Sequence, residues 1–329
     1  MKNKILALLA TIGLASSVSA VEINKNLSIN GFIDGSWQDT SSDVTGADLQ
    51  DVNLDEVELN FLLNAGNVSG EIHIDDTSNE GLNIEQAHFT YTLDNGLSVT
   101  FGRYGSKLGL EGEDPAGIYT FSRAYEGGAA ANYGDVDSFS MEGIALGYAT
   151  DSLSFNLSLD QSVGDNLKND NEGLNYELAV SYTGIDNLVA NIGYRVNQEG
   201  DNSAADIEST HLNVNASYTL GKALIAAEWQ EASNDNIALS DNGDVEAYQI
   251  LVDYDFSDKL GGTIRYSEQD LDDDSTSGLE VSKFTVAPNY AITSSLGLIV
   301  EYSAVDVDTA AGAASEDYDY LAAELTFTF

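Results

Sequence analysis

The residue types that most often perform chemistry are sparse in this 329-residue chain, and their spacing does not suit catalysis. The chain has no cysteine, which excludes a thiol nucleophile, a disulfide and a thiolate metal site. The three histidines, His73, His88 and His211, all fall on the polar faces of alternating segments. A histidine base needs a nucleophile and an orienting group within reach, and no recognisable spacing provides them. We therefore expect no enzyme, no cofactor and no metal site.

Carboxylates dominate the charge of the chain. Asp and Glu number 55 against 12 Lys and Arg, and the formal net charge is -43. Such acidity would repel phosphate, which argues against a nucleic-acid partner, and it would attract cations. Acidic clusters at 272–274, 306–308 and 316–319 could bind divalent cations weakly or bridge lipopolysaccharide through them. None has the pattern of a twelve-residue calcium loop, and solvated surface charge is the simpler interpretation.

One long segment, 105–138, combines charge with glycine and apolar residues: GSKLGLEGEDPAGIYTFSRAYEGGAAANYGDVDS. Loops of this length are usually functional or disordered, and this one is too apolar for disorder. If a scaffold held its charged side chains around a pore, their opposed charges would create a field that selects ions. The side chains concerned are Lys107, Glu111, Glu113, Asp114 and Arg123. The alternative is that they lie at an outer rim, in water.

The segments on either side of this loop alternate between apolar and polar residues with the period of a β-strand. In LSFNLSLD (153–160), the leucines and the phenylalanine share one face and the polar residues share the other. The last segment, EDYDYLAAELTFTF (316–329), repeats this pattern. Lipid offers no water to unpaired backbone groups, so strands of this kind must close on themselves. The pattern predicts a transmembrane antiparallel β-barrel.

Aromatic residues recur near the ends of eight such segments, each just before a short turn or at the chain end. They are Phe61, Tyr91, Tyr148, Tyr182, Tyr218, Tyr254, Tyr290 and Phe327. An aromatic at that place in every hairpin predicts a ring at one membrane interface. We expect strands rising from the short turns to begin near Leu27, Val68, Leu97, Leu153, Leu188, Ala223, Leu260 and Leu296. We expect descending strands to begin near Val52, Leu82, Phe139, Leu174, Glu208, Val245, Leu279 and Asp317. This makes about sixteen strands of about ten residues, with long polar loops on the far side.

The two ends of the chain carry signals of export and assembly. MKNKILALLATIGLASSVSA has a basic start, a short apolar run and a small-x-small ending, as in a cleaved secretory signal. We expect cleavage between Ala20 and Val21, which leaves 21–329 as one barrel domain after a signal at 1–20. The aromatic carboxyl terminus, Phe329, is similar to the closing residue that the assembly machinery reads in Gram-negative outer-membrane barrels.

Part of the chain resembles the OmpL-like β-barrel porins of Gram-negative bacteria. The resemblance covers about Gln86 to Tyr125 and is carried by Gln86-Ala87 with the strand to Leu93, by DNGLSVTFGRYGSKLGLEG and by YTFSRAY. It implies a diffusion channel in the outer membrane. By analogy with general porins, the third long loop would fold into the barrel and narrow it. General porins of this size are often trimers, so a homotrimer is one open assembly state.

The expected architecture is therefore an all-β barrel with its third outer loop folded toward the lumen, in the outer membrane of a Gram-negative bacterium. Ions and small hydrophilic solutes would diffuse through it, with a preference for cations. Three strand cations on polar faces, Arg195, Arg265 and Lys283, join the loop charges as candidates for the lumen or constriction. Arg103 shares an apolar face with Phe101, so a bulge, snorkelling or inward rotation is expected there.

The expected partners are outer-membrane lipid, lipopolysaccharide, the assembly machinery and the permeating solutes. Two other functions remain open at this stage. One is a substrate-specific channel, which an aromatic slide along the lumen would mark. The other is a plugged barrel that acts as an adhesin or receptor through its acidic outer loops, and a lumen without conductance would favour it.

Overall fold

The computed structural model describes residues 20–42, 49–77, 81–111, 114–125, 140–162, 174–200, 206–235, 243–273, 278–309 and 317–329. Within these ranges no helix is long and apolar enough to cross a membrane. The regular elements in these ranges are strands and one 3₁₀ turn, η1 (Pro115–Gly117).

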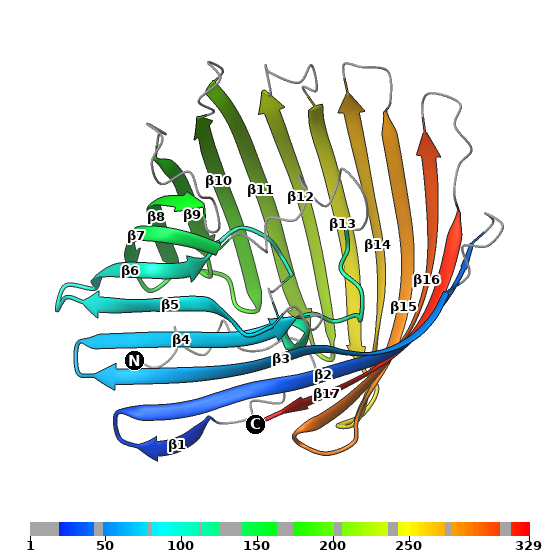
Figure 1. Ribbon diagram of the computed structural model, residues 1–329, viewed down its shortest axis with the longest axis horizontal. Coiled ribbons are helices and arrows are strands. Elements are labelled where there is room, and N and C mark those ends of the chain that lie inside the picture. Colours follow the sequence, from blue (N-terminus) through cyan, green and yellow to red (C-terminus); the bar gives the residue numbers. More distant parts are fainter. Residues whose placement is uncertain are drawn as a thin grey trace.

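The strands follow one another around a ring, each antiparallel to its neighbours (Figure 1). Their bounds are β1 Val21–Asn24, β2 Leu27–Ser42, β3 Leu49–Ala65, β4 Val68–Thr77, β5 Asn83–Thr92, β6 Leu97–Gly105, β7 Ser140–Ala149, β8 Leu153–Ser162, β9 Asn175–Tyr182, β10 Leu188–Gly200, β11 Asp206–Leu220, β12 Ala223–Asp235, β13 Gly243–Asp255, β14 Leu260–Asp273, β15 Leu279–Ala291, β16 Leu296–Thr309 and β17 Tyr318–Thr328.

The ring closes where the last strand meets the second. β17 pairs with β2 from Tyr318↔Ser42 to Thr328↔Phe32, and β9 pairs with β10. Of the 17 strands in the described part of the chain, β1 stands outside the ring, so sixteen strands form a closed barrel. The predicted barrel and its strand number are confirmed. Closure pairs each of these sixteen strands on both sides, so the ring itself has no open edge.

Apolar residues face outward and polar residues face inward, as the alternation predicts. On β8, Phe155, Leu157 and Leu159 are exposed, whereas Ser158 and Asp160 are fully buried inside the barrel. This inversion of a soluble protein's burial suits a wall with lipid outside and polar groups inside. The aromatic ring follows the same rule, because the predicted tyrosines and Phe327 all have exposed outward side chains.

The short turns fall at one end of the barrel. Tyr148 lies opposite Leu97, the first residue of β6, and Tyr182 lies opposite Leu153, the first residue of β8. The aromatics therefore form a band beside the turns. Gly66 and Gly221 begin the two-residue turns after β3 and β11 with φ of 77° and 64°. A side chain rarely tolerates that backbone, and such turns match the twist of the paired strands.

The first residues of the rising strands agree with the prediction, whereas those of several descending strands differ from it. All eight rising strands begin at the predicted residue, from Leu27 to Leu296. Descending β3 begins at Leu49, earlier than Val52, and runs for 17 residues instead of about ten. The hairpin of β2 and β3 continues into polar sequence that resembles a loop. The short strand β1 was not predicted, and it pairs with the start of β2 where β17 ends.

Candidate functional site: a loop held against the inner wall

The long loop after β6 returns into the barrel and is tied first to β9. The Ser106 hydroxyl donates to Glu177 Oε2 and the Lys107 backbone N–H donates to Glu177 Oε1, both at 2.8 Å. Leu108 then packs over β10 at Gly193, where a Cβ would lie only 2.6 Å from Leu108 Cδ1. The absence of a side chain at Gly193 therefore lets the loop lie directly on the wall.

The middle of the loop crosses the inner faces of β11 to β13. The Asn215 side-chain amide donates to the Gly109 carbonyl at 3.1 Å, and Leu110 and Tyr119 pack against a cluster that includes Leu224 and Leu251. The Tyr119 hydroxyl is buried without a hydrogen-bond partner. Burial, with the Asp253 carboxylate nearby, raises the pKa of Tyr119 well above its usual range, so it stays neutral.

A carboxylate on β16 holds the segment that follows η1. Glu301 Oε2 accepts from the backbone N–H groups of Phe121 at 2.7 Å and Ser122 at 3.2 Å, and Glu301 Oε1 accepts from the Ser122 hydroxyl. The Tyr320 hydroxyl on β17 also donates to Glu301, at 3.0 Å. Glu301 is fully buried, and these donors satisfy both of its carboxylate oxygens.

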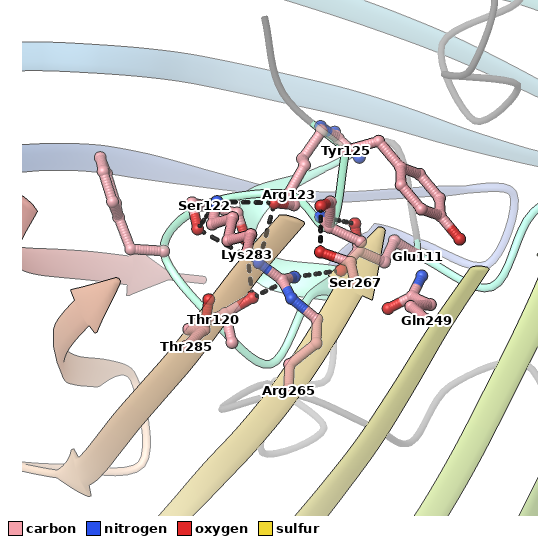
Figure 2. Close-up of polar contacts among 12 residues, drawn as sticks. Glu111, Thr120, Ser122, Arg123, Tyr125, Gln249, Arg265, Ser267, Lys283 and Thr285 are labelled. Carbon is pink, nitrogen blue, oxygen red and sulfur yellow. Dashed lines mark hydrogen bonds and ion pairs between the residues drawn. The ribbon is translucent and has the colours of Figure 1, made fainter. Parts of the chain in front are cut away.

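Two cations on neighbouring strands complete the attachment (Figure 2). Arg265 on β14 donates to Thr120 Oγ1 at 2.8 Å, to the Ser122 carbonyl at 2.9 Å and to the Arg123 carbonyl at 2.8 Å, and it pairs with Glu111. Lys283 on β15 donates to Ser122 Oγ at 2.6 Å and to the Arg123 carbonyl at 3.0 Å. Both side chains lie beneath the loop, where water does not reach them.

Glu111 joins the two arms of the loop. One oxygen takes the Arg265 ion pair and the other accepts from the Ala124 backbone N–H at 2.9 Å. The Ser267 hydroxyl on β14 donates to the Ala124 carbonyl, and the Tyr125 hydroxyl donates to Glu228 on β12 at 3.2 Å. The attached segment thus spans the inner wall from β9 to β17, and Figure 1 draws it within the ring.

The predicted loop charges have different fates. Glu111 is buried at the Arg265 pair, whereas Lys107 is exposed. Asp114 is half-buried beside η1, and Arg123 is half-buried with its side chain directed away from Arg265 (Figure 2). Glu113 lies outside the described residues. The loop candidates therefore do not share one role.

The strand cations Arg195, Arg265 and Lys283 lie on the inner face, and none is open to water. Arg265 and Lys283 are covered by the loop, and Arg195 on β10 forms an ion pair with Asp160 at 2.8 Å. Glu177, the first anchor of the loop, lies 3.7 Å from Arg195. These residues position the loop and the wall instead of meeting solutes directly.

Inward carboxylates gather on the wall formed by β17 and β2 to β5, and the sequence interpretation did not single them out. They include Asp34, Asp55, Glu56, Glu58, Glu71, Asp75, Glu85 and Glu324. The bases among the described inward residues of β2 to β5 are His73 on β4 and His88 on β5, which lies opposite Glu71. The signal was available in VNLDEVELN, where Glu56 and Glu58 share a face, and in EIHID, where Glu71 and Asp75 share a face with His73.

Arg103 keeps its outward position without a bulge or an inward rotation. The register of β6 against β5 and β7 has no shift, and Arg103 Nη2 donates to Glu142 Oε1 on β7 at 2.6 Å. Another guanidinium nitrogen donates to the Ile84 carbonyl. A neighbouring carboxylate thus neutralises the one arginine on the outer face of these strands, which lowers the penalty of its position.

Comparison with known proteins gives the same architecture. A model of the family described as beta-barrel porin-2, OmpL-like, matches residues 24–329. No curated protein matches the chain. Among solved structures, the outer-membrane channel DcaP of Acinetobacter baumannii is similar with a TM-score of 0.72 at 17% identity, over 95% of this chain and 100% of DcaP.

Two further structures show how widely this fold is shared. The anion-selective porin from Comamonas acidovorans matches with a TM-score of 0.69 at 13% identity, over 92% of this chain and 99% of its own. OmpT of Vibrio cholerae, in its trimer form, matches with a TM-score of 0.66 at 14% identity, over 93% and 100%. At such identities the likeness establishes the fold alone.

Proposed function

Since this chain belongs to the OmpL-like beta-barrel porin-2 family, we propose that it lets ions and small hydrophilic solutes diffuse passively across the outer membrane. It is a porin-family barrel of that membrane. The observation that carries the proposal is the attachment of the long loop to one side of the inner wall. Buried hydrogen bonds and ion pairs fix it to strands from β9 to β17.

The proposed path runs between this loop and the opposite wall. The loop lies on inner-wall strands from β9 to β17, so the free lumen borders β2 to β8. On that side Glu71 keeps 43% of its side chain exposed, and Glu56 and Asp75 are half-buried. Among the loop residues that the structure describes, Lys107 is exposed and Arg123 is half-buried. Opposed charges across a narrow passage impose a transverse field on solutes.

A cation preference follows from the balance of charges along this path. Arg195, Arg265 and Lys283 are sealed in ion pairs or beneath the loop, so they contribute little to the field in the water. The wall carboxylates are less well neutralised, because the described inward residues of β2 to β5 include two bases, His73 and His88, against a larger number of carboxylates. A fixed negative wall raises the local concentration of cations and lowers that of anions. The porin of similar fold from Comamonas acidovorans is anion-selective, which indicates that the lining residues, and not the fold, determine whether cations or anions are preferred.

Single-channel recording tests the proposal. The mature protein, inserted in a planar bilayer under a KCl gradient, should give stable conductance steps and a reversal potential of the sign that cation flow produces. Arg123→Glu should move the reversal potential further in that direction, and Lys222→Glu, at an exposed short turn, serves as the control. Insertion without conductance would refute diffusion. Conductance with an anion-shifted reversal potential would refute only the charge argument.

Three parts of this proposal concern maturation and assembly. We propose cleavage between Ala20 and Val21, which the mass of the purified protein's N-terminal peptide would reveal. We propose that Phe329 marks the chain for the outer-membrane assembly machinery. A homotrimer is proposed by analogy with the trimer form of OmpT, and the mass of the detergent-extracted complex would test it.

A further inference from the structure

Three side chains from three consecutive strands converge on the inner wall. They are Glu58 on β3, His73 on β4 and Glu85 on β5, and one potential ligand atom of each lies within 4.8 Å of the others. His73 Nδ1 is 3.4 Å from Glu58 Oε1 and 3.7 Å from Glu85 Oε2. The cluster is separate from the residues that anchor the loop, and it lies on the wall that borders the proposed path.

A β-bulge brings Glu85 into this group. His73 pairs with Gln86 and the next residue, Ile74, pairs with Ile84, which leaves Glu85 as the extra residue of β5. Ile74 and Ile84 both belong to the outer face, and Gln86 pairs with inward His73. Without the bulge, the alternation set by Phe89 and Ala87 would place Glu85 outside. Bulges re-aim side chains in this way, often beside functional sites.

The converging atoms lack hydrogen-bond partners. Neither oxygen of Glu58 has one, nor does His73 Nδ1 or Glu85 Oε2. The Glu58 side chain is 0% exposed, so water does not solvate its carboxylate. Buried carboxylates are normally paired with donors or with a cation, because desolvated charge is unfavourable. An atom that bonds to all three groups at once would satisfy this requirement.

The spacing fits a metal ion better than a protonated histidine. Charge-assisted hydrogen bonds from an imidazolium to a carboxylate typically measure about 2.7–2.9 Å, shorter than the separations at Nδ1. Ligands around a tetrahedral ion with bonds of about 2.1 Å stand about 3.4 Å apart. The two Nδ1 separations are close to that value. Small rotations of the carboxylates would place all three atoms on one ion.

The second nitrogen of His73 is already held for such a role. Glu71 Oε2 lies 3.2 Å from His73 Nε2, on the side opposite the cluster. A proton on Nε2 donates to this carboxylate and leaves the Nδ1 lone pair free to bind a cation. Metal-ligating histidines usually donate their other ring N–H in this way, which fixes the tautomer and the ring orientation.

We propose that Glu58, His73 and Glu85 bind a divalent first-row transition-metal ion on the inner wall of the barrel. An imidazole with two carboxylates suits Zn²⁺ and its neighbours, whereas Ca²⁺ and Mg²⁺ prefer oxygen ligands throughout. His73 and Glu85 are each 13% exposed, so an ion can arrive from the lumen. The bound ion would also neutralise part of the acidic wall.

The test is Zn²⁺ binding to the folded full-length mature barrel in detergent, measured by calorimetry with Ca²⁺ in large excess to suppress non-specific carboxylate sites. The wild type should bind one equivalent. His73→Asn and Glu58→Gln should abolish that binding, and Glu71→Gln should weaken it by about 10- to 100-fold. His88→Asn, which removes an inward histidine from the adjacent strand, should leave it unchanged. Absent binding in the wild type, or full binding in His73→Asn, would overturn the proposal.

A second measurement needs no variant, so it holds even if a substitution impairs folding. X-ray absorption at the zinc edge of wild-type protein with one equivalent of Zn²⁺ reports the ligands directly. The proposal requires one imidazole and a first shell of nitrogen and oxygen at about 2.0–2.2 Å. A shell of oxygen alone, without the imidazole signal, would show that the ion sits on surface carboxylates and would overturn the assignment.

Discussion

Replacement of Arg265 by methionine should release the loop from the wall while the barrel stays closed. Arg265 joins five loop groups: Glu111, Thr120, Ser122 through its carbonyl and hydroxyl, and Arg123 through its carbonyl. Methionine keeps much of the volume but none of the donors, so Glu111 is left buried without its cation. Loss of one partner of a buried ion pair destabilises by about 3–5 kcal/mol.

This loss destabilises the attachment of the loop to the wall, not the pairing of the strands. The opening equilibrium of the attached segment should therefore rise by roughly two to three and a half orders of magnitude. Hydrogen exchange reports it directly, because the Phe121 and Ser122 amides donate to Glu301 and the Ala124 amide donates to Glu111. Peptide-level mass spectrometry of 119–125 should show exchange accelerated by that factor.

A matched control separates the anchor from a general effect of arginine loss. Arg195 is buried to the same degree, but it pairs with Asp160 and lies beside Glu177, far from the 119–125 attachment. Arg195→Met should leave exchange in 119–125 unchanged. If Arg265→Met failed to accelerate that exchange, or if both variants accelerated it equally, the role given to Arg265 would be refuted.

Three further outcomes follow from the wall and its closure. Leu157→Arg, on the lipid side of β8, should destabilise the barrel by about 2–4 kcal/mol in urea unfolding from lipid vesicles, whereas Asn156→Arg on the inner face should change stability little; equal effects would contradict the assigned faces. Phe329→Ala should slow assembly in cells but not refolding in vitro, because the backbone hydrogen bonds between Phe329 and Gly31 remain. Heat-modifiable mobility on gels measures both processes. A refolding defect would indicate that Phe329 has a structural role instead. Glu142→Leu should destabilise the barrel by leaving Arg103 unpaired on the outer face, and the double variant Glu142→Leu/Arg103→Leu should restore stability; no recovery in urea unfolding would show that the pair is not the cause.

Much of the barrel could be predicted because its rules are local. Period-two alternation, a short turn and an aromatic just before it recur in each hairpin, so the rising strands were located at their first residue, as at Leu153 and Leu260. The other strand ends were less certain. Beyond the lipid, strands no longer need an apolar face, and the polar extension of β3 before Val52 cannot be told from a loop by its pattern.

The site depended on contacts between residues far apart in the chain. The polar faces of β14 and β15 placed Arg265 and Lys283 on the inner wall, but no local pattern indicates that the loop carbonyls of Ser122 and Arg123 would cover them. The bulge at Glu85 is a second case. It reverses the alternation for one residue, so period-two reasoning places that carboxylate on the wrong face.

The central claim is that water and solutes pass between the loop and the acidic wall. Because the chain has no cysteine, single cysteines can report the path when a charged thiosulfonate reagent is added during single-channel recording. Glu71→Cys, on the exposed wall, should react and lower the conductance in a discrete step. Ser267→Cys, beneath the loop and 1% exposed, should not react. Block at Ser267→Cys with none at Glu71→Cys would place the path on the other side of the loop and contradict the account.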